Sequence, residues 1–281
     1  MVRFALVCLV AAVASASSAS AQSPVERGKY LANGIGACSN CHTPRLQGGA
    51  LDLEKLMSGG PQTFNDPAYT VKGSNLTPDP ETGLGKVSDA DIKREITQGK
   101  RSDGQQLAPN MPYSVYGVLT VSDQSAIVAY LRSIPPIHNE VQKPVYKGAI
   151  KFTPYPPAAK PMEDVDLNDP IKRGLYLTAL GHCVLCHSRP SADGSLDYKN
   201  GLGGGGRKFG PQGAVIAANL TSKGVASWSD AEIKRALTEG VSHDGRKLNA
   251  PMVDFAQYYR TMTDADINAI IAWMRSLPPV E

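Results

Sequence analysis

The residues best suited to chemistry are four cysteines in two closely spaced pairs, each pair followed directly by a histidine. The two groups are Cys38, Cys41 and His42, and Cys183, Cys186 and His187. Two residues between the cysteines let both sulfurs reach the two vinyl-derived carbons on one edge of a porphyrin, and the adjacent histidine then lies beneath the iron. The pattern therefore predicts two covalently bound haem c groups, with the cysteines as attachment points and the histidines as iron ligands.

Three other kinds of site use the same residue types. A C-x-x-C pair can be redox active, can form a local disulfide, or can supply half of a zinc site. A thioredoxin-like pair belongs to a βαβ context, which neither segment has, and two zinc half-sites would not each need a trailing histidine. Haem attachment is favoured because the motif occurs twice and uses every cysteine after residue 21.

The ligand on the other side of each iron decides whether a haem group carries electrons or binds a substrate. Met111 and Met252 are the candidates, because they follow matching Asp-Gly pairs and stand beside prolines. A thioether is a soft, neutral ligand that favours reduced iron. The alternative is that both methionines fill gaps in the hydrophobic core, as methionines commonly do. Their matching positions favour ligation.

The sequence around these residues occurs twice, and the repeat predicts the domain organisation. The shared segments are Arg-Gly-x-Tyr-Leu at 27–31 and 173–177, Asn-Leu-Thr at 75–77 and 219–221, and Ser-Asp-Ala-Asp/Glu-Ile-Lys-Arg at 88–94 and 229–235. We predict two tandem domains, residues 22–136 and 170–281, each with one C-x-x-C-H motif. Residues 137–169 match neither copy and are rich in proline, so they are predicted to be a linker.

Helical signals dominate both copies. Ser229 and Glu232 have the spacing of a capping box at a helix start, and Ser88 and Asp91 have a weaker form of it. Apolar residues near the end of each copy follow helical spacing and are succeeded by a proline pair. Strand signals are weak throughout, so we predict a mainly α fold.

Charge and targeting signals narrow the possible partners. The 281 residues carry a formal net charge of +3 and no run of five like charges, so the chain lacks the basic surface that nucleic-acid binding requires. Residues 1–21 have the pattern of a signal peptide: Arg3, an apolar stretch, then Ala19-Ser20-Ala21 before the cleavage point. This predicts export to the periplasm. The alternative, an uncleaved anchor, has an apolar stretch shorter than the roughly 20 residues that a spanning helix needs. We expect no transmembrane segment in the mature chain.

These motifs resemble those of tandem class I c-type cytochromes, and in particular the cytochrome subunits of periplasmic alcohol, aldehyde and gluconate dehydrogenases. The resemblance rests on the two C-x-x-C-H motifs and on Asn75-Leu76-Thr77-Pro78-Asp79, Thr82-Gly83-Leu84-Gly85 and Pro109-Asn110-Met111-Pro112-Tyr113. It implies two cytochrome c-like domains, with thioether bonds at Cys38, Cys41, Cys183 and Cys186, proximal ligands His42 and His187, and distal ligands Met111 and Met252. Two features depart from those subunits: they usually carry three haem groups, and Met252-Val253-Asp254-Phe255 differs from Met-Pro-Tyr.

The sequence therefore predicts a periplasmic dihaem c-type cytochrome that takes electrons from a dehydrogenase and passes them to a terminal oxidase or a small redox carrier. In this interpretation the chain is not itself an enzyme. A dihaem enzyme, such as a peroxidase or a sulfur-compound dehydrogenase, is the alternative, and a permanent subunit of a larger membrane-bound complex is a third. His138, His182 and His243 do not recur between the copies, so we expect them at the surface or in supporting positions.

Overall fold

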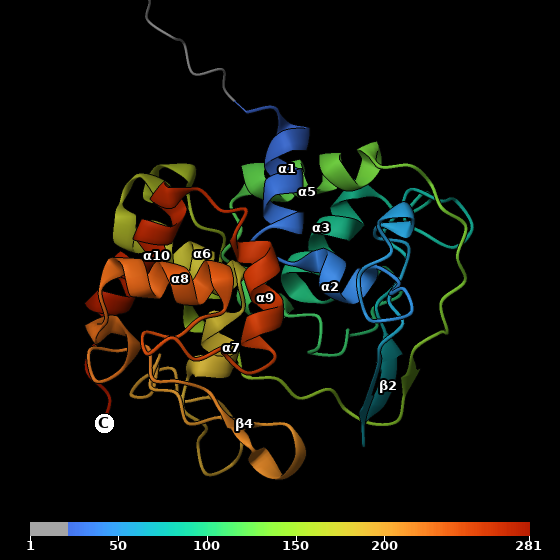
Figure 1. Cartoon of the computed structure of the whole chain (residues 1–281). Coiled ribbons are helices and arrows are strands. Elements are labelled where there is room, and N and C mark those ends of the chain that lie inside the picture. Colours follow the sequence, from blue (N-terminus) through green and yellow to red (C-terminus); the bar gives the residue numbers. More distant parts are fainter. Residues whose placement is uncertain (1–21) are drawn as a thin grey trace, which may run out of the picture.

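The computed structural model describes residues 22–281, and its regular structure is mainly helical, as predicted (Figure 1). The predicted signal peptide, residues 1–21, lies outside the described residues. The α-helices are α1 (Pro24–Asn33), α2 (Cys38–His42), α3 (Asp89–Gln98), α4 (Tyr113–Tyr116), α5 (Val121–Ser133), α6 (Pro170–Leu180), α7 (Cys183–His187), α8 (Asp230–Glu239), α9 (Met252–Tyr259) and α10 (Asp264–Ser276). Within the described residues, no helix is both long enough and apolar enough to cross a bilayer.

Strands form two small antiparallel sheets. One has the order β1-β2-β3 and the other pairs β4 with β5: β1 (Thr63–Asp66), β2 (Tyr69–Lys72), β3 (Val145–Tyr146), β4 (Lys208–Phe209) and β5 (Val215–Ile216). In the larger sheet, β1 and β2 form a hairpin with Asp66 opposite Tyr69. The third strand comes from the segment 137–169 and pairs with β2, Thr70 facing Val145. This segment therefore adds a strand to a hairpin that lies more than 70 residues earlier.

Two helices, α3 and α8, begin where the sequence signals predict. Ser229 and Glu232 form a complete capping box at the start of α8, and the Ser88 side chain accepts a hydrogen bond from the Asp91 backbone at the start of α3. Both helices end at a glycine in the left-handed conformation, Gly99 with φ 65° and Gly240 with φ 68°. A residue with a Cβ is strained in that conformation, so glycine stops each helix at a defined position.

Two crossed helix pairs form the scaffold of the molecule. In the N-terminal half, residues 22–136, α1 packs on α5, and in the C-terminal half, residues 170–281, α6 packs on α10. A glycine lies at each crossing: a Cβ on Gly28 would come 1.9 Å from the carbonyl oxygen of Ala126, and one on Gly174 would come 2.1 Å from that of Ala269. Only glycine permits this close approach, so the repeated Arg-Gly segment fixes the same helix crossing in both halves.

The arginine of each repeated segment also ties its two helices together. Arg27 of α1 donates from Nε and Nη2 to the Asp123 carboxylate of α5, at 2.8 and 2.7 Å. Arg173 of α6 donates from Nε to Asp266 of α10, at 2.5 Å. Charge-assisted bonds of this kind are among the stronger hydrogen bonds in proteins.

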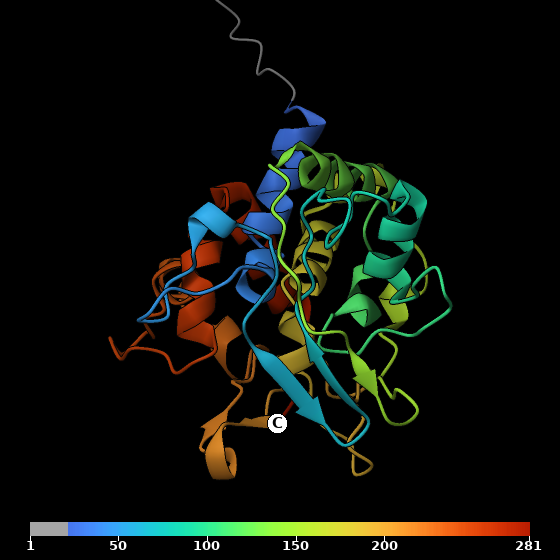
Figure 2. The ribbon, with the colours of Figure 1, turned by 90° about the vertical axis from the view of Figure 1, so that its right-hand side faces the viewer.

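The two halves lie side by side, and the same helices form the contact between them (Figures 1 and 2). The hydroxyl of Tyr30 in α1 donates to Asp266 of the other half at 2.5 Å. Reciprocally, the hydroxyl of Tyr176 in α6 donates to Asp123 at 2.5 Å. Each aspartate thus joins the arginine of its own half and the tyrosine of the other, so the contact is symmetric in its chemistry.

The segment between the halves is packed against both of them. It runs along the outside of the N-terminal half (Figure 1), where the backbone N–H of Met162 donates to the carbonyl oxygen of Val118 at 2.9 Å. Thr153 accepts a hydrogen bond at 3.2 Å from the backbone of Leu196 in the C-terminal half. Tyr155 is buried, at 2% exposure. Segment 137–169 therefore contacts both the N-terminal and the C-terminal half.

Candidate functional site

Each C-x-x-C-H segment forms one short helix, α2 or α7. The residue before each helix is left-handed: Ala37 has φ 45° and His182 has φ 58°. On a helix, residues three apart lie on one side, so the two sulfurs of each pair share a side. All four cysteines are free thiols rather than disulfides.

The chemistry of these thiols differs from that of a redox-active pair. Burial raises the pKa of the Cys38 and Cys183 thiols to about 12. A reactive dithiol depends instead on a lowered pKa, because the thiolate is the nucleophile. Thiols fixed on one side of a short helix are suited to thioether formation.

Both motif histidines are held in the form that can bind a metal. Nδ1 of His42 lies 2.7 Å from the carbonyl oxygen of Ser74, and Nδ1 of His187 lies 2.7 Å from that of Ala218. A carbonyl can only accept, so Nδ1 carries the proton and Nε2 keeps its lone pair for a metal ion. Burial also lowers the pKa of both imidazoles, which favours the neutral, ligating form.

The carbonyl that orients His42 belongs to a loop held by the repeated Asn-Leu-Thr segment. Asn75 Oδ1 accepts hydrogen bonds from the backbone N–H and the hydroxyl of Thr77, at 2.9 and 2.7 Å. Asn75 Nδ2 donates to the carbonyl oxygen of Ile137 at 2.8 Å, and the N–H of Ile137 donates back to the Thr77 hydroxyl at 3.1 Å. The segment after α5 therefore clamps the loop that begins beside Ser74.

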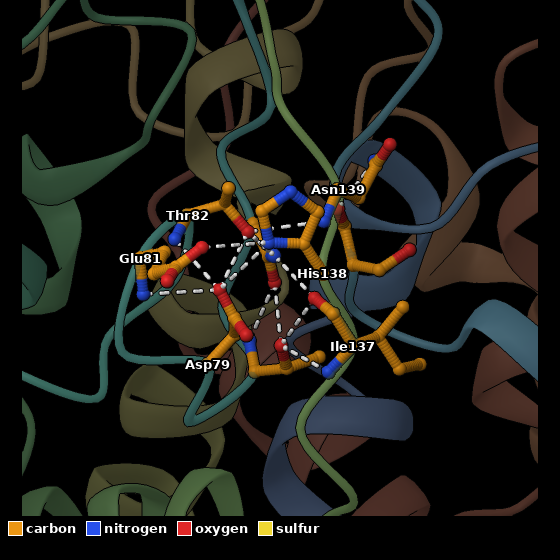
Figure 3. Close-up of polar contacts among 9 residues, drawn as sticks. Asp79, Glu81, Thr82, Ile137, His138 and Asn139 are labelled. Atoms are coloured by element: carbon orange, nitrogen blue, oxygen red, sulfur yellow. Dashed lines mark hydrogen bonds and ion pairs between the residues drawn. The ribbon is translucent and has the colours of Figure 1, made fainter.

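Figure 3 shows how the same loop is fixed further along. Asp79 accepts hydrogen bonds from the backbone and hydroxyl of Thr82, at 2.7 and 2.8 Å, and the Thr82 hydroxyl accepts one from the N–H of Asn139 at 3.0 Å. His138 points across to the two acidic residues, 3.5 Å from Glu81 and 3.8 Å from Asp79. Its side chain is 58% exposed, so His138 lies at the surface, as the sequence analysis expected.

The C-terminal half repeats this clamp. Asn219 Nδ2 donates to the carbonyl oxygen of Val280 at 2.7 Å, and the N–H of Val280 donates to the Thr221 hydroxyl at 3.3 Å. Asn219 directly follows Ala218, whose carbonyl orients His187. The sequence analysis found the repeated Asn-Leu-Thr segment but not its role, which is to fix the carbonyl that precedes it.

A cavity of about 1330 Å³ adjoins the first motif. Cys38, Cys41, His42 and Met111 all line it, so the structure brings together the four groups that the sequence assigned to one centre. Much of the remaining wall is apolar and comes from α1, α3 and α5: Leu31, Ile92, Ile96, Ile127 and Leu131. Two thiols, an imidazole and a thioether around an apolar space larger than most small-molecule pockets fit a covalently bound porphyrin.

The same cavity extends to the second motif. Leu185, Cys186 and Phe255 line it from the C-terminal half. Cys183, His187 and Met252 do not belong to its wall. The structure therefore brings the ligand candidates of the first motif to one cavity. Met252, the first residue of α9, stays a prediction for the second motif.

Residues 25–135 match the protein-family model Cytochrome c. This part of the chain belongs to the cytochrome c family. Membership confirms the resemblance inferred from the motifs. A cytochrome c domain implies haem c bound covalently through its C-x-x-C-H segment.

Several known proteins match nearly the whole chain. It is 31% identical to a component of the nicotinate dehydrogenase of Pseudomonas putida and 30% identical to the cytochrome c subunit of a quinone alcohol dehydrogenase of Gluconacetobacter polyoxogenes, over 90% and 97% of this chain. It spans only 21% and 60% of those two proteins. A diheme cytochrome c-type protein of Cereibacter sphaeroides is 27% identical over 88% of this chain and 83% of its own length.

Proposed function

We propose that this cytochrome is an electron-transfer protein with two haem c groups, which accepts electrons from a dehydrogenase in the periplasm and passes them to a terminal oxidase or a small redox carrier. One observation carries the proposal: in both halves, a short helix carries two cysteines and a histidine whose Nδ1 is bonded to a carbonyl oxygen at 2.7 Å. When bound, haem c supplies an iron that changes its charge by one electron.

In this proposal, each half holds one haem c with its own residues. The attachment residues are Cys38 and Cys41 in one half and Cys183 and Cys186 in the other, and the axial ligands are His42 with Met111 and His187 with Met252. The carbonyls of Ser74 and Ala218 keep the imidazole proton on Nδ1. The apolar residues of the cavity give the first centre a low-dielectric wall, which favours the reduced, less charged iron.

We also propose that the halves are two tandem cytochrome c-like domains, residues 22–136 and 170–281, joined by the proline-rich linker 137–169. The matched helix crossings at Gly28 and Gly174 support this arrangement, as do the matched Asn-Leu-Thr clamps. The family match covers residues 25–135, so the C-terminal domain rests on the repeat and on these matched contacts.

The dehydrogenase partner is proposed from the related proteins, two of which are named as dehydrogenase subunits. Export by the predicted signal peptide, residues 1–21, would place the cytochrome on the periplasmic side. The alternative from the sequence is a dihaem enzyme with catalysis at one haem. A peroxidase or a sulfur-compound dehydrogenase would need an iron with an open position.

Denaturing mass spectrometry of periplasmic protein tests the proposal. The expected mass is that of the chain from Gln22 with two haem groups attached. Cys41→Ala and Cys186→Ala form a matched pair, and each should weaken attachment only in its own half. A mass with one haem or none would refute the proposal, and rapid peroxide turnover by the isolated protein would favour the dihaem enzyme.

A further inference from the structure

Two side chains connect the segments that carry the C-x-x-C-H motifs. Tyr116, at the end of α4 in the N-terminal half, places its hydroxyl 2.5 Å from Nε2 of His182, which directly precedes Cys183. The same hydroxyl lies 3.5 Å from the carbonyl oxygen of Gly36, two residues before Cys38. One side chain therefore touches both attachment segments.

The tyrosine of this contact is buried. Tyr116 is 4% exposed, and its ring centroid lies 5.6 Å from that of His182. The rings of His182 and Phe255 pack edge to face at 6.0 Å on the other side. Aromatic packing against the His182 ring restricts the geometry of this hydrogen bond.

The fold does not require this bond, because the equivalent positions of the other half are arranged differently. Tyr259 occupies the place of Tyr116, four residues before the N-cap of the next helix, and its hydroxyl donates to Gly181 of its own half at 3.0 Å. Ala37 occupies the place of His182 and has the same left-handed backbone. The bond between the halves therefore depends on the side chain of His182 and not on the local fold.

Both residues also lie on the wall of the cavity that reaches both motifs. Tyr116 and His182 line it between the first centre, with His42, and the second motif, with Cys186. Neither side chain is an attachment residue or an axial ligand in the proposed function. Their place is at the boundary between the two centres.

On the basis of the proposed function, we propose that Tyr116 and His182 are positioning residues that fix the mutual orientation of the two haem c groups. The bond holds His182, the residue before Cys183, against Tyr116. The Tyr116 hydroxyl in turn lies 3.5 Å from the carbonyl oxygen of Gly36, two residues before Cys38. Without the bond, the segments that precede α2 and α7 keep their apolar packing but lose the hydrogen bond that sets its geometry, while each half keeps its own cysteines and histidine.

Circular dichroism in the Soret band of the full-length, haem-loaded protein tests this proposal. Two porphyrins that lie close in a fixed orientation couple their transitions and give a pair of bands of opposite sign. We expect this couplet in the native protein, and we expect Tyr116→Phe and His182→Ala each to remove most of it. His182→Ala introduces the residue that the other half carries at this position, so the backbone conformation should be retained. The double variant should lose no more than either single one, because all three remove the same bond.

Tyr130→Phe is the matched control. It removes the hydroxyl of another buried tyrosine in the same half, one that accepts a hydrogen bond from Asn33 at 2.6 Å, and it should leave the couplet unchanged. The mass of each variant is measured in parallel. Three results would overturn the positioning role. The native protein could carry two haem groups and show no couplet, the couplet could survive both Tyr116→Phe and His182→Ala, or Tyr130→Phe could reduce it equally. A native mass with fewer than two haem groups would refute the proposed function itself.

Discussion

Replacing Asp123 by alanine should destabilise the protein far more than replacing an aspartate at the surface. The Asp123 side chain is 6% exposed and accepts hydrogen bonds from Nε and Nη2 of Arg27 and from the hydroxyl of Tyr176. The substitution leaves a partly buried guanidinium and a buried hydroxyl without this partner. Removing one member of a buried ion pair costs about 3–5 kcal/mol, and an unpaired buried hydroxyl costs about 1–3 kcal/mol. Because the Arg27 side chain keeps 25% exposure, we expect a total of about 3–5 kcal/mol.

Urea unfolding followed by circular dichroism measures this loss, with Asp264→Ala as the matched control. Asp264 pairs with Lys234 at 2.6 Å, but its side chain is 75% exposed, and such pairs contribute about 0–1 kcal/mol. In thermal unfolding, Asp123→Ala should lower Tm by about 6–20 °C. Tyr176→Phe should cost only about 1 kcal/mol, since Asp123 keeps its arginine. Equal losses in Asp123→Ala and Asp264→Ala would show that the buried network does not stabilise the fold.

Three further predictions concern the ligand set, the helix crossing and pH. Met111→Ala should remove about half of the weak sulfur-to-iron absorption of the oxidised protein. It should also lower one midpoint potential, within the roughly 0.8 V that axial ligands span. If the sulfur-to-iron band keeps its full strength in this variant, another residue is the ligand. Gly28→Ala should lower the free energy of unfolding by about 1–3 kcal/mol, because its Cβ would meet the Ala126 carbonyl. Gly148→Ala is the control: its Cβ meets nothing closer than 3.8 Å, so stability should change by less than about 0.5 kcal/mol. Burial lowers the pKa of His182, which contacts Tyr116, to about 4, below the usual 6.5, so the unfolded chain takes up this proton at higher pH than the folded one. Its contribution to stability should be complete above pH 6.5 and fall as the pH drops toward 4, and His182→Ala should flatten that part of the Tm profile.

The sequence predicted the parts of the molecule whose signals are local. The helix starts at Ser88 and Ser229 depend on side chains within a few residues, so they can be identified from the chain alone. The short strands could not be identified, since segments of two to four residues are too short to show alternation, and β3 pairs with a hairpin far away in the sequence.

The residues that would bind haem could be predicted from the sequence, but the groups that orient them could not. The motif cysteines and histidines are defined by residue type and spacing, whereas the groups that orient the histidines are the backbone carbonyls of Ser74 and Ala218. Every residue has a carbonyl, so no residue type marks these positions. The role of His182 was equally hidden, because its partner Tyr116 lies 66 residues earlier in the chain.

The reciprocal bonds of Tyr30 and Tyr176 give each half a self-complementary face. Each half carries both the donor and the acceptor of the contact, as the subunits of an isologous homodimer do. In the proposed tandem arrangement, two such faces lie in one chain, so each half can change its sequence independently of the other. The residue before the first cysteine shows that freedom: alanine at 37 and histidine at 182 occupy one backbone position and make different contacts. A symmetric pair of separate chains would have to carry the same residue at both places.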